Sequence, residues 1–176
     1  MRIALTLVWL AVSLGATREE RALAAEPAGC GDDPKLALLD FWLGEWTVTH
    51  EGTTLGSNRI ERTLDGCAIL EHWTSARGGR GLSLFYVGPA GEALKQVWIT
   101  TDARGPGGTK EKSLLTRAAD GTLVFQGVWW HEDGREILDR TRLTPLPDGR
   151  VRQHWRVSVD GGTTWKDLFV GFYARR

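Results

Sequence analysis

The feature that most constrains the fold is a series of short alternating segments separated by glycine turns. From Glu45 onward, apolar and polar residues alternate with period two, which is typical of half-buried β-strands. Several connections contain Asp-Gly, which favours tight hairpins because both central residues of a type I′ turn need a positive φ. The predicted strands are 45–51, 57–64, 67–75, 82–87, 94–101, 110–117, 122–131, 136–144, 150–159 and 165–175.

Sequential strands joined by hairpins predict an all-β fold, a single up-and-down antiparallel β-barrel of about ten strands. A β-sandwich is the alternative, but the sequence shows no long crossover connection. The 176 residues, 41% of them hydrophobic, are enough for one domain with a sizeable core. A short N-terminal helix is expected before the first strand, because Asp33 and Pro34 suit its start and Gly44 its end.

The first residues predict a cleaved signal peptide. Arg2 precedes an uncharged, mostly apolar run over 3–16, which is too short to span a bilayer comfortably. The small-residue site Ala22-Leu23-Ala24 predicts cleavage after residue 24. Residues 25–32 are then a linker and 33–176 the barrel domain. We expect a periplasmic or secreted protein that is not an integral membrane protein once processed.

The chain has two cysteines, Cys30 and Cys67. Export would place them in an oxidising compartment, and they lack C-x-x-C spacing, so we expect a disulfide between them. The four histidines show no metal-binding spacing, and no metal site is predicted. Basic and acidic residues are equal in number, 22 each, with no basic stripe, so nucleic acid is not an expected partner.

Three predicted strands repeat one pattern, in which a polar residue lies two positions before a tryptophan. The pairs are Glu71 and Trp73, Gln96 and Trp98, and Gln153 and Trp155. On 150–158 the opposite parity carries arginine and histidine, which must be solvated, so Gln153 and Trp155 are expected to point inward. Such residues would form an aromatic-walled small-molecule site. The alternative is a filled barrel in which each polar group satisfies a neighbouring side chain.

Three further residues complete the candidate ligand-binding set. His50 and Asn58 share the inward parity of their strands. A two-residue turn at 65–66 would place Arg62 diagonally near Glu71, within reach of a salt bridge. Glu71 is also the candidate acid or base of an enzyme, with its pKa set by Arg62 and the indoles.

The segment from Ser158 to Trp165 matches S-x-D-x-G-x-T-W, the Asp-box pattern found in sialidases and other β-proteins. The box is structural in those proteins, and one copy does not indicate a sialidase. We therefore expect Ser158, Asp160, Gly162 and Trp165 to stabilise the last hairpin.

Gly44-Glu45-Trp46 resembles the G-x-W that begins the first strand of lipocalins, and Arg175 resembles the arginine that they place over this tryptophan. The chain also resembles a family of bacterial secreted domains of unknown function. The motifs that carry this resemblance are FWLGEW at 41–46, GCAILE at 66–71, QVW at 96–98, DGRVRQ at 148–153 and SxDGGxTW at 158–165. The resemblance implies a calycin-like barrel and brings no established activity. Extra hairpins and the lack of a long C-terminal helix distinguish the chain from lipocalins.

These patterns predict an exported barrel that binds a small, mostly apolar molecule in an aromatic-lined lumen. Three alternatives remain open: a structural envelope protein with a filled barrel, an enzyme that uses Glu71, and a haem-binding barrel with His50 as ligand. The sequence implies no cofactor and does not indicate the oligomeric state.

Overall fold

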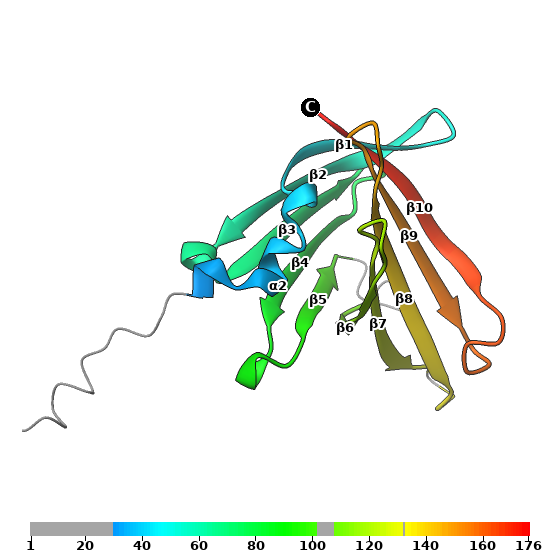
Figure 1. Ribbon diagram of the computed structural model, residues 1–176. Helices are drawn as coiled ribbons and strands as arrows, with labels where there is room; N and C mark the ends of the chain where they lie inside the picture. The colour runs from blue at the N-terminus through cyan, green and yellow to red at the C-terminus, as the bar shows by residue number, and fades with distance from the viewer. Residues whose placement is uncertain (1–29, 102–107, 132) are drawn as a thin grey trace, which may run out of the picture.

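The protein folds into a closed barrel of ten antiparallel strands, each hydrogen-bonded to its neighbours in sequence order. The structure is a computed structural model, and it describes residues 30–101, 108–131 and 133–176. The expected signal peptide and most of the expected linker lie outside these residues. The predicted all-β, up-and-down barrel is confirmed (Figure 1).

The ten predicted strands all occur, and their ends differ from the prediction by a few residues. Asp-Gly turns and period-two patterning therefore locate the strands well in this chain. The strands are β1 (Gly44–His50), β2 (Thr53–Thr63), β3 (Ala68–Ser75), β4 (Arg80–Val87), β5 (Leu94–Thr100), β6 (Lys110–Arg117), β7 (Leu123–Trp130), β8 (Glu136–Pro145), β9 (Val151–Ser158) and β10 (Lys166–Arg175).

The N-terminal segment is not one helix. It contains a four-residue α-helix, α2 (Pro34–Ala37), between 3-10 turns at Cys30–Asp32 and Asp40–Trp42. Asp33 caps α2, as expected, by accepting a 2.8 Å hydrogen bond from the Lys35 backbone N–H. The buried residues Leu36, Leu39 and Trp42 recur every three positions. Residues three apart lie on one face of either kind of helix, so the segment presents all three side chains to the barrel although its helix is broken.

A disulfide between Cys30 and Cys67 joins this segment to the turn between β2 and β3, as predicted. The Cα atoms of the two cysteines are 4.7 Å apart. The turn itself also has the expected form, because Asp65 and Gly66 have positive φ angles of 53° and 90°. It sets the β2–β3 register, in which Ile60 pairs with Glu71.

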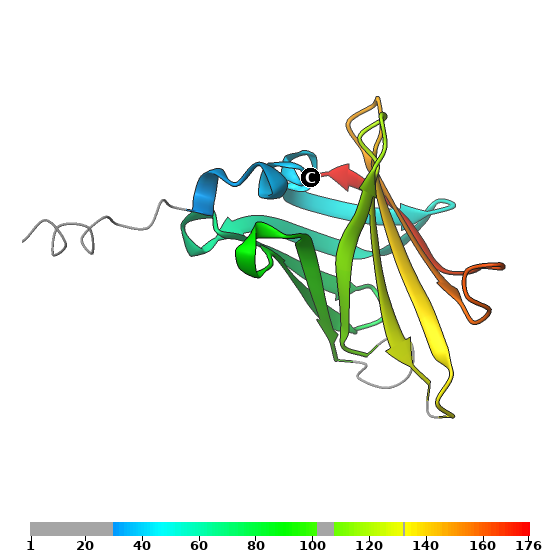
Figure 2. The same ribbon diagram turned by 60° about the horizontal axis from the view of Figure 1, so that its bottom comes forward.

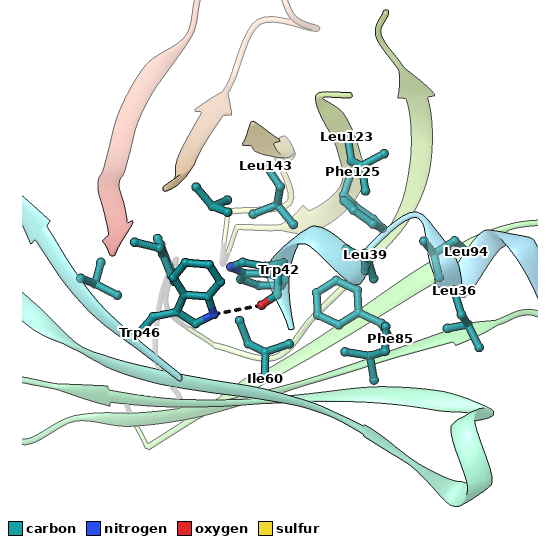
Figure 3. Close-up of a cluster of buried hydrophobic side chains, with 14 residues drawn as sticks. Leu36, Leu39, Trp42, Trp46, Ile60, Phe85, Leu94, Leu123, Phe125 and Leu143 are labelled. Atoms are coloured by element: carbon teal, nitrogen blue, oxygen red, sulfur yellow. Dashed lines mark hydrogen bonds between the residues drawn. The ribbon is translucent and has the colours of Figure 1, made fainter. Parts of the chain in front are cut away.

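The N-terminal segment lies over one end of the barrel (Figure 2), and buried apolar side chains fill that end (Figure 3). We call this region the capped end; it consists of Leu36, Leu39, Trp42, Trp46, Ile60, Ile69, Phe85, Leu94, Leu123, Phe125, Leu143 and Val151. The Trp46 indole donates a 2.9 Å hydrogen bond to the Trp42 carbonyl (Figure 3). The Trp42 ring makes an edge contact with Phe85 at 5.6 Å between centroids.

The contact between Trp46 and Arg175 has the predicted geometry. The two residues are paired in register where β1 meets β10 and closes the barrel. The Arg175 guanidinium carbon lies 4.5 Å from the centre of the Trp46 ring, and the same group donates to the Leu43 carbonyl at 3.0 Å. Arg175 therefore covers the outer side of the capped end.

Candidate functional site

A cavity of about 120 Å³ lies in the barrel beyond the capped end. We call this region the cavity end. Its aromatic lining residues are Trp73, Trp98, Trp155, Phe169 and Tyr173. Its polar lining residues are Glu71, Gln96, Lys110, Lys112, Thr141 and Gln153. The site thus combines aromatic walls with a few convergent polar groups, which is typical of small-molecule sites.

Six of the nine residues predicted to bind a ligand line this cavity. They are the three polar and tryptophan pairs: Glu71, Trp73, Gln96, Trp98, Gln153 and Trp155. Asn58 is buried next to the cavity, where its side chain donates a hydrogen bond to Glu71. His50 and Arg62 are not among the lining residues. A role in ligand binding stays a prediction for all of them.

Inward-facing glycines make room for the aromatic walls. A Cβ atom at Gly81 of β4 would overlap the Trp98 ring, and one at Gly56 of β2 would lie 2.8 Å from the Trp73 ring. On β10, a Cβ atom at Gly171 would lie 2.7 Å from the Phe169 ring. The rings therefore lie against bare backbone, and this leaves the centre of the lumen open.

Glu71 lies at the base of the cavity and is only 3% exposed. Its Oε1 accepts a 2.7 Å hydrogen bond from the Asn58 amide. Burial raises the pKa of Glu71, whereas hydrogen bonds from Ser83 and Asn58 and the charge of Lys112 oppose the shift. The raised pKa favours the neutral carboxylic acid.

Gln96 extends this polar network. Its amide nitrogen donates a 3.0 Å hydrogen bond to the Ser83 hydroxyl, which in turn contacts Glu71. Gln96 Oε1 is buried and has no hydrogen-bond partner among the described residues. Because buried polar atoms in proteins are nearly always paired, this atom marks a place where a ligand donor fits.

A cluster that the sequence prediction did not include lines the cavity next to β5, where Lys112 is paired with Gln96 and Lys110 with Trp98. Lys110 Nζ and Lys112 Nζ each lie 2.6 Å from a different carboxylate oxygen of Asp139. The Trp155 indole donates a 2.8 Å hydrogen bond to the same carboxylate. Lys112 also donates to the Thr141 hydroxyl at 2.5 Å. The three charged side chains are at most 5% exposed.

The lysines reach Asp139 across an intervening strand. Lys110 and Lys112 lie on β6 and Asp139 lies on β8, with β7 between them. The β7 residue paired with Asp139 is Gly127, which has no side chain to block the path. Burying three charges together is tolerable only because each is paired. Lys110 and Lys112 share one face of β6, which is readable from the sequence, but their pairing with Asp139 across β7 is not.

Burial also changes the protonation of the lysines. It lowers the pKa of Lys110 to about 8, although the neighbouring Asp139 carboxylate acts in the opposite direction. The pKa of Lys112 is lowered for the same reason. Lys110 therefore remains mostly an ammonium at pH 7. Its Nζ also lies 3.6 Å from the centre of the Trp155 ring, a cation–π contact.

The expected salt bridge between Arg62 and Glu71 is wrong. Arg62 instead contacts Asp40 Oδ1 at 2.6 Å and the carbonyls of Gly31 and Gly66 at 3.4 Å. Arg62 lies on the capped side of Ile60, where the N-terminal segment and the turn between β2 and β3 supply these acceptors. Glu71 is satisfied from the other direction, by Asn58 and Ser83.

His50 lies away from the cavity, near the turn between β1 and β2. Its side chain is 38% exposed and lies 3.9 Å from Glu51. A cavity of about 120 Å³ is also far smaller than the roughly 300 Å³ of the smallest pockets that hold drug-sized ligands. This geometry does not favour haem binding through His50.

The Asp-box segment connects β9 to β10 away from the cavity. The Asp160 carboxylate accepts hydrogen bonds from the Ser158 hydroxyl at 2.7 Å and from the Thr164 backbone at 2.9 Å. A further hydrogen bond from the Thr164 hydroxyl at 2.6 Å, together with these two, lowers the pKa of Asp160 to about 2. The Trp165 indole donates to the Gly162 carbonyl at 2.9 Å. The contacts hold the hairpin turn together.

In the described part of the chain, no group of three or more His, Cys, Asp or Glu side chains is arranged to hold a metal ion. The helices described there are also too short and too polar for any of them to cross a membrane. A comparison with models of known protein families and with curated protein sequences finds no match to this chain.

Proposed function

We propose that this barrel binds a small, mostly apolar molecule with a polar end. The observation that carries the proposal is the cavity itself, whose lining combines five aromatic side chains with six polar ones. Trp73 and Trp98 offer apolar faces, and Glu71 offers a hydrogen-bonding group between them. A filled structural barrel is the competing account, and the unpaired Gln96 Oε1 argues against it.

The size of the cavity limits the ligand to about one ring. An engineered apolar cavity of about 150 Å³ binds benzene, and the present cavity has about 120 Å³. A compact aromatic or heterocyclic compound therefore fits better than a sterol or a long acyl chain.

We also propose that the fold is lipocalin-like and that the protein is exported. Trp46 at the start of β1 and Arg175 stacked on it support the first part. The disulfide supports the second, because disulfides persist in oxidising compartments. Intact-mass measurement of the secreted protein tests export: loss of residues 1–24 is expected, and a retained Met1 would contradict it.

Tryptophan fluorescence tests ligand binding. Titration with phenol, indole, benzoate, benzamide and benzylamine should quench the emission for at least one compound. Trp155→Ala should weaken the binding of that compound while the fold is retained. Trp130→Ala is the matched control, because Trp130 is 66% exposed on the outer face of β7. Native mass spectrometry of protein from its own periplasm should show a co-purified molecule.

Two results together would overturn the binding proposal: unchanged fluorescence with every compound, and no co-purified molecule. The filled structural barrel would then be the better account.

The raised pKa of Glu71 favours a second candidate, an enzyme that transfers a proton within the cavity. A bound compound would then be converted to product on incubation, which mass spectrometry detects. Glu71→Gln keeps the shape and the hydrogen bond to Asn58 but cannot exchange a proton. This variant should bind the compound and not convert it; equal conversion by both proteins would exclude the role.

A further inference from the structure

We propose that the natural ligand is a ring-sized carboxylate whose anionic group is bound by Lys110 and Lys112. The inference rests on the proposed binding function and assigns the chemical class of the ligand. It follows from three observations: the hydrogen-bond donors that the lysines still have, the balance of charge around the cavity, and the arrangement of the aromatic walls.

The first observation is the number of unused donors. An ammonium group has three N–H donors. Among the described residues, Asp139 is the oxygen partner of Lys110, and Asp139 and Thr141 are those of Lys112. Both ammonium groups line the cavity, so their remaining N–H groups are available to a ligand there. A carboxylate accepts from two such donors through charge-assisted hydrogen bonds.

The second observation is the charge balance. Asp139 is one carboxylate between two ammonium groups. The other acidic side chain that lines the cavity is Glu71, whose burial favours the neutral form. With both lysines protonated and Glu71 neutral, the cavity carries one excess positive charge. A ligand anion compensates that charge, whereas a ligand cation would face two lysines in a buried site, which is unfavourable.

The third observation is the position of the rings. The Trp155 indole is fixed by its hydrogen bond to Asp139 and lies directly beside Lys110 Nζ. Trp73 and Phe169 meet edge to face at 6.0 Å and form another part of the wall. A carboxylate attached to a flat ring therefore finds cations and aromatic faces in the same small space. A bare inorganic anion would use only the cations.

The experiment compares compounds of the same size and different charge. Benzoate, benzamide and benzylamine are titrated into the protein at pH 7 by calorimetry. We expect benzoate to bind about tenfold or more tightly than benzamide, because a hydrogen bond to a charged group is worth on the order of a factor of ten. Benzylamine should not bind measurably. Acetate should bind more weakly than benzoate because it lacks the ring.

Lys110→Met tests the assignment directly. The variant keeps the aliphatic stem, and Asp139 retains Lys112 and the Trp155 indole as partners, so the barrel is expected to fold. Its affinity for benzoate should fall to that for benzamide. Lys95→Met is the matched control on the adjacent strand: Lys95 is paired with Glu111 outside the cavity, and its loss should leave benzoate binding unchanged.

The pH dependence of the unmodified protein gives a second test that needs no variant. The groups that face Lys110 are Lys112 on β6, Asp139 on β8, Glu71 on β3, Trp155 on β9 and Tyr173 on β10. Lys110 loses its proton as the pH rises through about 8. The affinity for benzoate should therefore fall between pH 7 and pH 10, and the affinity for benzamide should stay constant.

The outcomes separate the two proposals. Equal affinity for benzoate and benzamide, or a preference for benzylamine, overturns the carboxylate inference and leaves the binding function in place. Benzoate binding that is unaffected by Lys110→Met and by pH also overturns it. Absence of benzoate binding overturns the inference; if the wider panel also fails and no molecule co-purifies, the binding function falls as well.

Discussion

The capped end and the cavity end are built from the same strands but hold different side chains. On β3, the inward residue at the capped end is Ile69, and the next two inward residues are Glu71 and Trp73 at the cavity end. On β8, Leu143 lies at the capped end and Asp139 at the cavity end. The position along the barrel axis, rather than the strand, therefore determines the type of inward residue.

The two ends also contribute differently to stability. The capped end removes large apolar side chains from water, which stabilises the fold. The cavity end buries charged groups, whose loss of hydration costs free energy even when they are paired. We infer that the capped end provides most of the stability of the fold and that the cavity end serves a purpose other than stability. The predictions below test this division.

The largest effect is expected at Trp42, which is 1% exposed at the centre of the capped end. Trp42→Ala should lower the free energy of unfolding by about 3–5 kcal/mol, because it removes a fully buried ring and leaves a void. Urea denaturation measures the change. Trp155→Ala should cost less, since Trp155 is half-buried and already borders a cavity. Equal losses at the two positions would contradict the proposed division.

The disulfide should contribute the next largest effect. Replacing Cys30 and Cys67 together by serine should cost about 3–4 kcal/mol on the chain-entropy model for a separation of 37 residues. Denaturation in the absence of reductant measures it. In hydrogen exchange, the double variant should lose amide protection first at residues 30–42. If amide protection were lost first around β6 and β8, the disulfide would support the cavity end instead.

Gly81→Ala, at the cavity end, should lower the free energy of unfolding by about 1–3 kcal/mol, the usual range for overpacking. The added methyl group would overlap the Trp98 ring and push it toward the lumen. Ligand binding should weaken as well. Gly79→Ala is the control, because a Cβ atom there meets its nearest neighbour at 3.8 Å. If the two variants were equally stable, Trp98 would not be held against Gly81.

The smallest effect is expected at Arg175. Arg175→Ala should lower the stability by about 0.5–1 kcal/mol, the range of an exposed cation–π contact. Arg176→Ala should have a smaller effect, because the Arg176 side chain donates a 3.2 Å hydrogen bond to the Thr47 hydroxyl at an exposed site. Thermal denaturation of the two variants in parallel gives the comparison. Equal shifts would argue that the stacking on Trp46 adds nothing to the capped end.

The strands and their faces could be predicted because the signals are local. Asp65-Gly66 sets its own turn, and the turn sets the register of β2 and β3. On β9, arginine and histidine at alternate positions identify the outer face and place Gln153 and Trp155 inside. The period-two pattern also identified the three polar and tryptophan pairs, and all three line one cavity.

The basic cluster could not be predicted in the same way, because no local pattern contains it. Lys110 and Lys112 begin a strand that reads as charged and solvated, KEKSLLTR. Their burial depends on Asp139, two strands away, and on Gly127 between them. The predicted salt bridge between Arg62 and Glu71 was wrong for a similar reason, since the partner of Arg62 is Asp40 in the N-terminal segment. When the partners of a side chain are remote in sequence, its burial and pairing can be recognised only from the three-dimensional structure.

The closure between β1 and β10 has a consequence for the order of folding. Trp46 pairs with Arg175, so the first and final strands of the barrel must meet before the capped end is sealed. During synthesis, residues 36–46 leave the ribosome long before β10 does. Contacts of such large sequence separation form slowly, because the ends of a long loop must come together first. The tryptophans at 42 and 46 therefore remain accessible to water and to chaperones until synthesis of the barrel is almost complete.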